Sequence, residues 1–166
     1  SYSGTISGTG ALNVAGGNQL TLSGTLSSYT GEITTSAAST NLILSSAVGA
    51  TATATVGASS TLTINTDTTL ANLANSGTVN VSSTGPRTLT LSFTSGTITP
   101  GGTYTGGGNL EKAGSGGILD LTTATFTSIG TVTSTAGQVT LDPNASMPTN
   151  VADDATVVFD ASGIST

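Results

Sequence analysis

Few side chains in this sequence are equipped for acid–base or nucleophilic chemistry. The 166 residues include no His and no Cys, and the only basic side chains are Arg87 and Lys112. A Ser or Thr nucleophile needs a base beside it, so Lys112 or a carboxylate would have to serve. Lys112 stands in the stretch Leu-Glu-Lys-Ala-Gly, where Glu111 and the surrounding repeat pattern account for it structurally. We therefore predict no catalytic residue and no enzymatic activity.

The carboxylates offer two further kinds of chemistry, glycoside hydrolysis and metal binding. Asp153 and Asp154 are adjacent, so on a strand they point to opposite faces and cannot jointly flank a glycosidic bond. Asp142 and Asp160 each follow an apolar strand residue and can stack on one edge, whereas Asp120 precedes its apolar residue. Solvated turns are the favoured interpretation, with calcium as the alternative because turn carboxylates are its usual ligands. We predict neither a metal site nor a cofactor.

Glycine-rich stretches and glycosylation sequons are explained without a binding function. Gly101-Gly102 and Gly106-Gly107-Gly108 lack the Gly-Lys-Ser/Thr sequence and the helix of a phosphate-binding loop, so we expect them to be corners. The sequons at residues 80–82 and 144–146 permit glycosylation, but short sequons arise by chance in a chain rich in Ser and Thr.

Charge and composition exclude several classes of partner. The formal net charge is −6, and nucleic-acid binding needs clustered Lys and Arg. Electrostatic binding to anionic lipid is excluded for the same reason, because it also needs clustered Lys and Arg. No run of about 18 apolar residues occurs, so we predict no membrane insertion by this segment. The chain begins Ser1-Tyr2, which suits a processed product or an excised fragment.

The elements that position these residues are predicted to be strands. Short stretches alternate apolar and hydroxyl side chains and are bounded by Gly, Ser, Asn or Asp, at residues 11–14, 20–22, 42–44, 61–64, 78–81, 88–93, 138–141 and 156–159. Thr, Val and Ile suit a pleated, half-buried surface. The sequence thus predicts an all-β fold.

The spacing of the strands favours a β-solenoid, with its strands in parallel ladders, over an antiparallel β-sandwich. The last apolar residue of successive strands recurs about every 20 positions, at Leu22, Leu44, Ile64, Leu121 and Leu141, with Val81, Ile98 and Phe159 as further members. A sandwich more often shows turns about every 8–12 residues. We expect these side chains to form one inward column in a rod of about eight coils, with strands about 4.8 Å apart. Residues 1–166 are predicted to be one domain, or a fragment of a longer one, and 142–166 a less regular terminal coil.

Two segments resemble the repeats of bacterial autotransporter passenger domains. Leu-Thr-Leu-Ser-Gly at 20–24 is followed by Tyr29-Thr30-Gly31, and Leu-Glu-Lys-Ala-Gly-Ser-Gly at 110–116 places Lys112 on the lysine of the repeat pattern. The sequence departs from the pattern after Gly116, where Gly117 shifts the alternation by one residue, and the Asn before each Tyr is missing. The matches cover about a third of the chain. The resemblance implies a right-handed β-helix exported to a bacterial cell surface.

We predict from this a non-catalytic adhesive or structural surface protein. Its partners would be host or cell-surface glycans or proteins, or other copies joined end to end through residues 2–6 and 157–164. The first alternative is a self-assembling extracellular fibre or matrix subunit. The third possibility is ice binding, because Thr-x-Thr pairs occur at residues 51–55, 61–63, 88–90, 97–99 and 131–133. Their intervals are irregular, which argues against one pair per coil in register.

Overall fold

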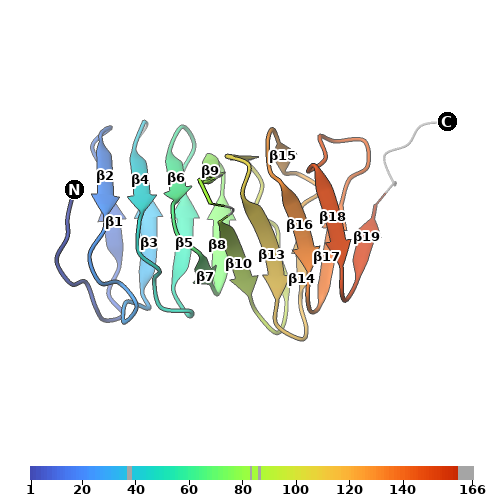
Figure 1. The fold of residues 1–166 in the computed structure, drawn as a ribbon, viewed down its shortest axis with the longest axis horizontal. Helices are drawn as coiled ribbons and strands as arrows, with labels where there is room; N and C mark the ends of the chain where they lie inside the picture. The colour runs from blue at the N-terminus through green and yellow to red at the C-terminus, as the bar shows by residue number, and fades with distance from the viewer. Residues whose placement is uncertain (37–38, 83, 86, 161–166) are drawn as a thin grey trace.

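The protein is a β-solenoid. The computed structural model describes residues 1–36, 39–82, 84–85 and 87–160, which form strands and turns but no helix. The chain winds through about seven turns, and the coils follow one another along a rod with the first and last strands at opposite tips (Figure 1). The strands are β1 (Leu12–Val14), β2 (Gln19–Leu22), β3 (Glu32–Thr35), β4 (Asn41–Leu44), β5 (Thr53–Val56), β6 (Thr61–Ile64), β7 (Thr68–Leu70), β8 (Asn72–Asn75), β9 (Thr78–Val81), β10 (Thr88–Ser92), β11 (Thr97–Ile98), β12 (Thr103–Thr105), β13 (Asn109–Ala113), β14 (Ile118–Asp120), β15 (Thr125–Phe126), β16 (Thr131–Ser134), β17 (Gln138–Leu141), β18 (Asn150–Asp153) and β19 (Val157–Phe159).

Four parallel sheets form the walls of the rod. The six-stranded sheet runs β2-β4-β6-β9-β12-β15, and the five-stranded sheet runs β7-β10-β13-β16-β18. The first four-stranded sheet is β1-β3-β5-β8, and the second is β11-β14-β17-β19. Every pairing between these strands is parallel, which confirms the solenoid and excludes the antiparallel sandwich.

The prediction of a single inward column of apolar residues is wrong, because these residues form two columns on two different sheets. Leu22, Leu44 and Ile64 are in register with Val81 on the six-stranded sheet. Leu141 is instead paired with Phe159 on the second four-stranded sheet, where Asp120, the residue before Leu121, is paired with Thr140. The reason is the long coil that follows β9. Thr78 is paired with Thr103, 25 residues later, so a strand found about 20 residues further along the sequence no longer lies on the same sheet.

Ile98 likewise lies on a different sheet from the one that the spacing suggests. Proposed as the missing member of the column, it pairs with Leu119 on the second four-stranded sheet and not with Val81. Periodicity shows that a coil recurs, but it does not show which wall of the coil a strand occupies. Strands of equal spacing on different walls therefore look identical in the sequence.

The core is a continuous set of inward side chains. Most strands alternate buried and half-exposed residues, as one inward and one outward face require. One hydrophobic cluster extends from Val14 to Leu141, and Tyr104 and Phe126 stack within it at 5.6 Å between ring centroids. In the last coil, β18 and β19 are largely exposed, since no described coil covers them. Within the described residues, no helix is long and apolar enough to cross a bilayer.

Candidate functional site

A row of small polar residues follows the six-stranded sheet at one corner of the rod. Ser23, Ser45, Asn65 and Ser82 each come directly after the last inward residue of β2, β4, β6 or β9. Each backbone N–H donates to the preceding coil, from Ser23 to Tyr2, Ser45 to Leu22, Asn65 to Leu44 and Ser82 to Ile64, at 2.9–3.0 Å. The ladder thus continues beyond the strands and holds these side chains in line along the rod.

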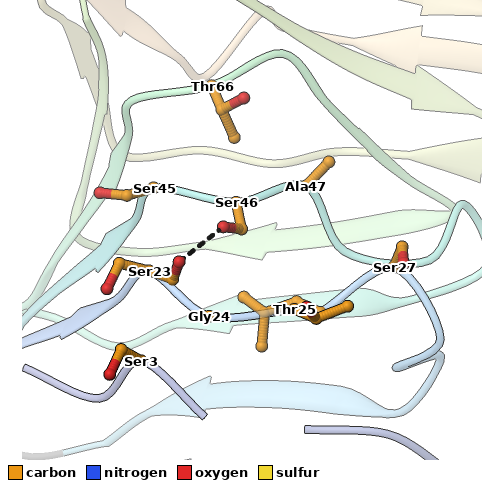
Figure 2. A pocket seen from close by; sticks show the side chains of 10 residues that line it. Ser3, Ser23, Gly24, Thr25, Ser27, Ser45, Ser46, Ala47 and Thr66 are labelled. Carbon is orange, nitrogen blue, oxygen red and sulfur yellow. Dashed lines mark hydrogen bonds between the residues drawn. The ribbon is translucent and has the colours of Figure 1, made fainter. Parts of the chain in front are cut away.

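The N-terminal part of this corner is hollowed into a groove, which we call the corner groove. It has a volume of about 570 Å³ and is lined by hydroxyl and small side chains: Ser3, Ser23, Gly24, Thr25, Leu26, Ser27, Ser45, Ser46, Ala47 and Thr66. Figure 2 shows these residues on successive passes of the chain, with the Ser46 hydroxyl donating to the Ser23 carbonyl oxygen at 3.2 Å. The groove is therefore uncharged and rich in hydrogen-bonding groups.

Gly24 sets how closely two coils approach in the corner groove. A Cβ atom at this position would collide with the backbone carbonyl oxygen of Gly4. Leu26 is only 2% exposed and anchors the same turn in the core. The turn is further tied to the next coil by a bridge between Leu26 and Val48.

A second hollow lies further along the same corner, and we call it the Arg87 hollow. It has a volume of about 280 Å³ and is lined by Asn65, Ser82, Thr84 and Arg87. The Nε atom of Arg87 is buried and has no hydrogen-bond partner in the described structure. Asp67 is nearby in the fold, but its carboxylate accepts a hydrogen bond from the backbone N–H of Thr88 at 2.9 Å.

The outer face of the six-stranded sheet carries threonines in two ranks. Thr61, Thr78, Thr103 and Thr125 are in register, and beside them Thr63, Asn80 and Thr105 form a parallel rank. Single threonines stay in register although the intervals between them differ, because loops of different length absorb the differences. Within these ranks only 61–63 and 103–105 are complete Thr-x-Thr pairs, which agrees with the expectation that there is not one pair per coil.

Most of the Thr-x-Thr pairs that the sequence singled out do not share this face. The pair at 61–63 lies on the six-stranded sheet, whereas 88–90 and 131–133 lie on the five-stranded sheet. Thr53 and Thr55 belong to β5 in the first four-stranded sheet, and Thr97 belongs to β11 in the second. The pair Thr103 and Thr105, with aromatic Tyr104 between them, lies on the six-stranded sheet but is not among the Thr-x-Thr pairs picked out from the sequence.

Lys112 is buried and links neighbouring turns of the coil through hydrogen bonds to backbone carbonyl groups. Its side chain is fully buried, and Nζ donates to the carbonyl oxygens of Phe93, Ala113, Gly114, Gly116 and Ala136 at 2.6–3.4 Å. The ammonium group also lies 4.1 Å from the centroid of the Phe93 ring. Burial lowers the pKa of Lys112. Glu111 faces outward and accepts hydrogen bonds from Thr90 and Thr135.

The candidate carboxylates are distributed over turns. Asp120 accepts from the N–H and hydroxyl of Thr122, and Asp142 accepts from the N–H and side-chain amide of Asn144. Asp153 accepts from the N–H of Ala155 and is in register with buried Ser134. These contacts fit the turn interpretation.

The stacking prediction for the carboxylates also fits the register. Asp142 and Asp160 follow the paired residues Leu141 and Phe159, whereas Asp120 aligns with Thr140. In the part of the chain that the structure describes, no three Asp or Glu residues are grouped as metal ligands.

The glycine stretches and the sequons lie in corners, strands and turns of the coil. Gly106 has a φ of 104°, and a Cβ there would collide with Asn80 and Val81, so the position requires glycine. Asn80 is half-buried on β9, and Asn144 is exposed in the turn that Asp142 caps. The glycines are therefore corners of the coil, as predicted.

The predicted end segments are partly paired. Tyr2 forms a bridge to Leu22 within the rod, while Val157–Phe159 pairs with β17 on one side only. Residues 161–164 of the second segment lie outside the described residues.

Comparison with protein-family models, with curated proteins and with solved structures finds no match for this chain. The arrangement therefore has to be interpreted from its own chemistry. Sequence analysis missed Arg87 and the corner groove, although one signal was present: a small polar residue follows the last apolar residue of successive strands.

Proposed function

We propose that this chain is a non-catalytic structural and adhesive segment of an exported protein on a bacterial cell surface. The observation that carries the proposal is the unbroken parallel stacking of coils with hydroxyl side chains turned outward. Such a stack forms a stiff spacer, because each coil is hydrogen-bonded to the next. The resemblance of residues 20–31 and 110–116 to autotransporter passenger repeats supports the same function.

The outer surface suits weak contacts repeated along a rod. Its faces present Thr, Asn and Ser at a spacing of about 4.8 Å between coils. Hydroxyl and amide groups exchange hydrogen bonds with sugar hydroxyls at little desolvation cost compared with buried charges. Glycans on a host or neighbouring cell are accordingly the proposed partners, and many simultaneous contacts would compensate for low individual affinity.

Adhesion of coated beads tests this function. Beads carrying the purified chain should attach to immobilised polysaccharide or to cultured cells, and pretreating those surfaces with glycosidases should reduce attachment. Beads carrying an unrelated acidic β protein of similar size serve as the control. Attachment no greater than that of the control on every surface would contradict an adhesive function.

Ice binding is the second candidate, favoured by the two threonine ranks on the six-stranded sheet. A flat face of in-register hydroxyl and methyl groups can order water in a lattice-like array. Thermal hysteresis of the purified chain measures the activity directly. Thr103→Lys, in the middle of one rank, should abolish any hysteresis, whereas Thr133→Lys on the five-stranded sheet should leave it unchanged. A wild-type protein without hysteresis removes this candidate.

A further inference from the structure

The corner groove and the Arg87 hollow lie next to each other along one corner of the rod, and we call the two together the polar track. Ser45 and Thr66 line the groove, and Asn65, adjacent to Thr66, lines the hollow. The row from Ser3 through Ser23, Ser45 and Asn65 to Ser82 occupies five successive coils, which corresponds to about 19 Å along the rod. Figure 2 shows the serine end of this row from close by. The track therefore fits an extended ligand lying parallel to the axis.

Arg87 gives one end of the track a chemistry that the rest lacks. It is one of two basic residues in the chain, and the other, Lys112, is buried against carbonyl groups. The Arg87 side chain is only partly buried and lines the hollow, and its buried Nε–H has no hydrogen-bond partner among the described residues, so the protein itself leaves this guanidinium group incompletely satisfied. The planar guanidinium group matches a carboxylate in two-pronged geometry. Ser82 and Thr84 bring hydroxyl groups to the same hollow.

The charges around the track limit how acidic the ligand can be. The chain carries a net charge of −6, and Asp67 lies close to Arg87 through its bond to Thr88. A polyanion would be repelled as a whole, whereas a short ligand with one carboxylate on Arg87 gains the local attraction. The uncharged groove then suits a hydroxyl-rich remainder.

We propose that the track binds an oligosaccharide along the rod axis, with the carboxylate of a uronic acid residue on Arg87. The sugar hydroxyls exchange hydrogen bonds with the serines and threonines of the corner groove. This inference rests on the proposed adhesive function and names the class of glycan that this particular site takes.

Titration followed by isothermal calorimetry and by backbone amide chemical shifts tests the inference. The ligands are trigalacturonic acid, its methyl-ester form with a single free carboxylate, its fully methyl-esterified neutral form, and sodium acetate. We expect the single-carboxylate form to bind at least tenfold more tightly than the neutral form, and amide shifts to change from Ser23 to Thr88. Acetate should bind much more weakly, because it reaches only Arg87.

Three variants locate the binding energy. Arg87→Gln should lower affinity for the single-carboxylate form at least tenfold and bring it to the level of the neutral form. Ser45→Val should weaken both forms without removing the preference for the acid. Asp67→Asn keeps the oxygen that accepts from Thr88 and removes a negative charge, so it should raise affinity several-fold. Thermal unfolding of each variant establishes that it is folded, and Arg87→Lys provides a charged replacement.

The outcomes separate this inference from the proposed function. Equal affinity for acidic and neutral forms would overturn the uronate assignment, and acetate binding as tightly as the trisaccharide would overturn the glycan assignment. If none of the ligands binds while coated beads still adhere, the inference fails and the adhesive function stands. If the beads also fail to adhere but Arg87-dependent binding is measured, the site stands without that function.

Discussion

Backbone carbonyl groups surround the ammonium group of buried Lys112 and take the place of water as its hydrogen-bond acceptors. Its Nζ atom has five carbonyl oxygens within hydrogen-bonding distance, contributed by three successive coils. Charged hydrogen bonds of this kind are stronger than neutral ones. The Ala113 oxygen also accepts from the backbone N–H of Phe93, but the other four carbonyl oxygens would lose this donor if the ammonium were removed. One lysine side chain therefore joins the turns after β10, β13 and β16.

Replacing Lys112 with Met should destabilise the fold by about 3 kcal/mol, because the buried carbonyl groups lose their shared donor. Urea denaturation followed by circular dichroism measures the change. Glu111→Gln also alters one charge on the same strand, but its amide keeps an acceptor oxygen for one of the Thr90 and Thr135 hydroxyls and offers an N–H to the other. It should therefore shift stability by less than about 0.5 kcal/mol. Similar effects of the two substitutions would contradict the role assigned to Lys112.

Tyr104 should make the protein sensitive to alkali. Burial raises the pKa of Tyr104 well above its ordinary value of 10.0, and its hydroxyl donates to the carbonyl oxygen of Pro100 at 3.2 Å. The unfolded chain then loses this proton above about pH 10 while the folded chain retains it, so stability falls as the pH rises further, by up to about 1.4 kcal/mol per pH unit.

Denaturation midpoints at pH 8 and pH 11 measure this dependence. Tyr104→Phe should cost about 1 kcal/mol at pH 8 through the lost hydrogen bond, yet lose less stability than the wild type on going to pH 11. A residual slope is expected from Tyr29, whose pKa is also raised by burial. An unchanged slope in the variant would show that Tyr104 is not the responsible group.

At the scale of elements, short strands and tight corners determine how coils stack. Strands of two to five residues keep their register although successive coils differ in length, from 17 residues between Thr61 and Thr78 to 25 between Thr78 and Thr103. Corners absorb the difference, and glycine is needed where one corner touches the next. The corner groove depends on one such contact, between Gly24 and Gly4.

Gly24→Ala should separate the first coils locally, because the added methyl group meets the carbonyl oxygen of Gly4. We expect a loss of about 1–3 kcal/mol and a weaker affinity of the corner groove for its ligand. Gly10→Ala is the matched control, since a Cβ atom there has nothing within 4 Å. The thermal unfolding temperatures of the two variants provide the comparison, and equal values would contradict close packing at this corner.

Sequence patterns predicted the walls of the rod better than its corners. Alternation located β1, β2, β4, β6, β9, β10, β17 and β19, because those strands contain two or more inward apolar residues. Inward polar residues hid other strands, as with Thr35 in β3, Asn75 in β8 and Ser134 in β16. The named stretches also omit β5, β7, β12, β13, β15 and β18, although β5 has the inward apolar residues Ala54 and Val56. Leu70 and Leu73 have helical spacing, but the corner at Ala71 places them on different strands.

The candidate site was harder to predict for a related reason. Whether Ser23 and Ser45 line a groove depends on which coils are adjacent and how far each loop extends. Neither property is encoded by residues close in sequence. The buried Nε atom of Arg87 depends likewise on packing between coils, so composition showed only that the residue was rare.

The whole molecule is a rod whose last described coil is incompletely covered. Phe159 is 52% exposed and Val158 is 37% exposed, and β18 and β19 each lie at the edge of a sheet. Unpaired strand edges invite further strands. The alternative function as a self-assembling fibre subunit draws its support from this end.

A fibre subunit should form filaments as the protein concentration rises, and negative-stain electron microscopy and sedimentation would detect them. Val158→Lys should suppress assembly by placing a charge at the edge. Thr133→Lys, an equivalent charge change on β16, which is paired on both sides by β13 and β18, should not. A chain that stays monomeric at high concentration would remove the fibre alternative.

Parallel pairing also determines how the rod responds to load. The hydrogen bonds between strands point from coil to coil, so tension applied to the two tips pulls directly along them and opens one ladder at a time. Each released coil of about 20 residues would lengthen the chain by roughly 65 Å. Stretched in an optical trap, the molecule should yield in a series of small, similar steps and act as an extensible tether that lengthens under strain without detaching.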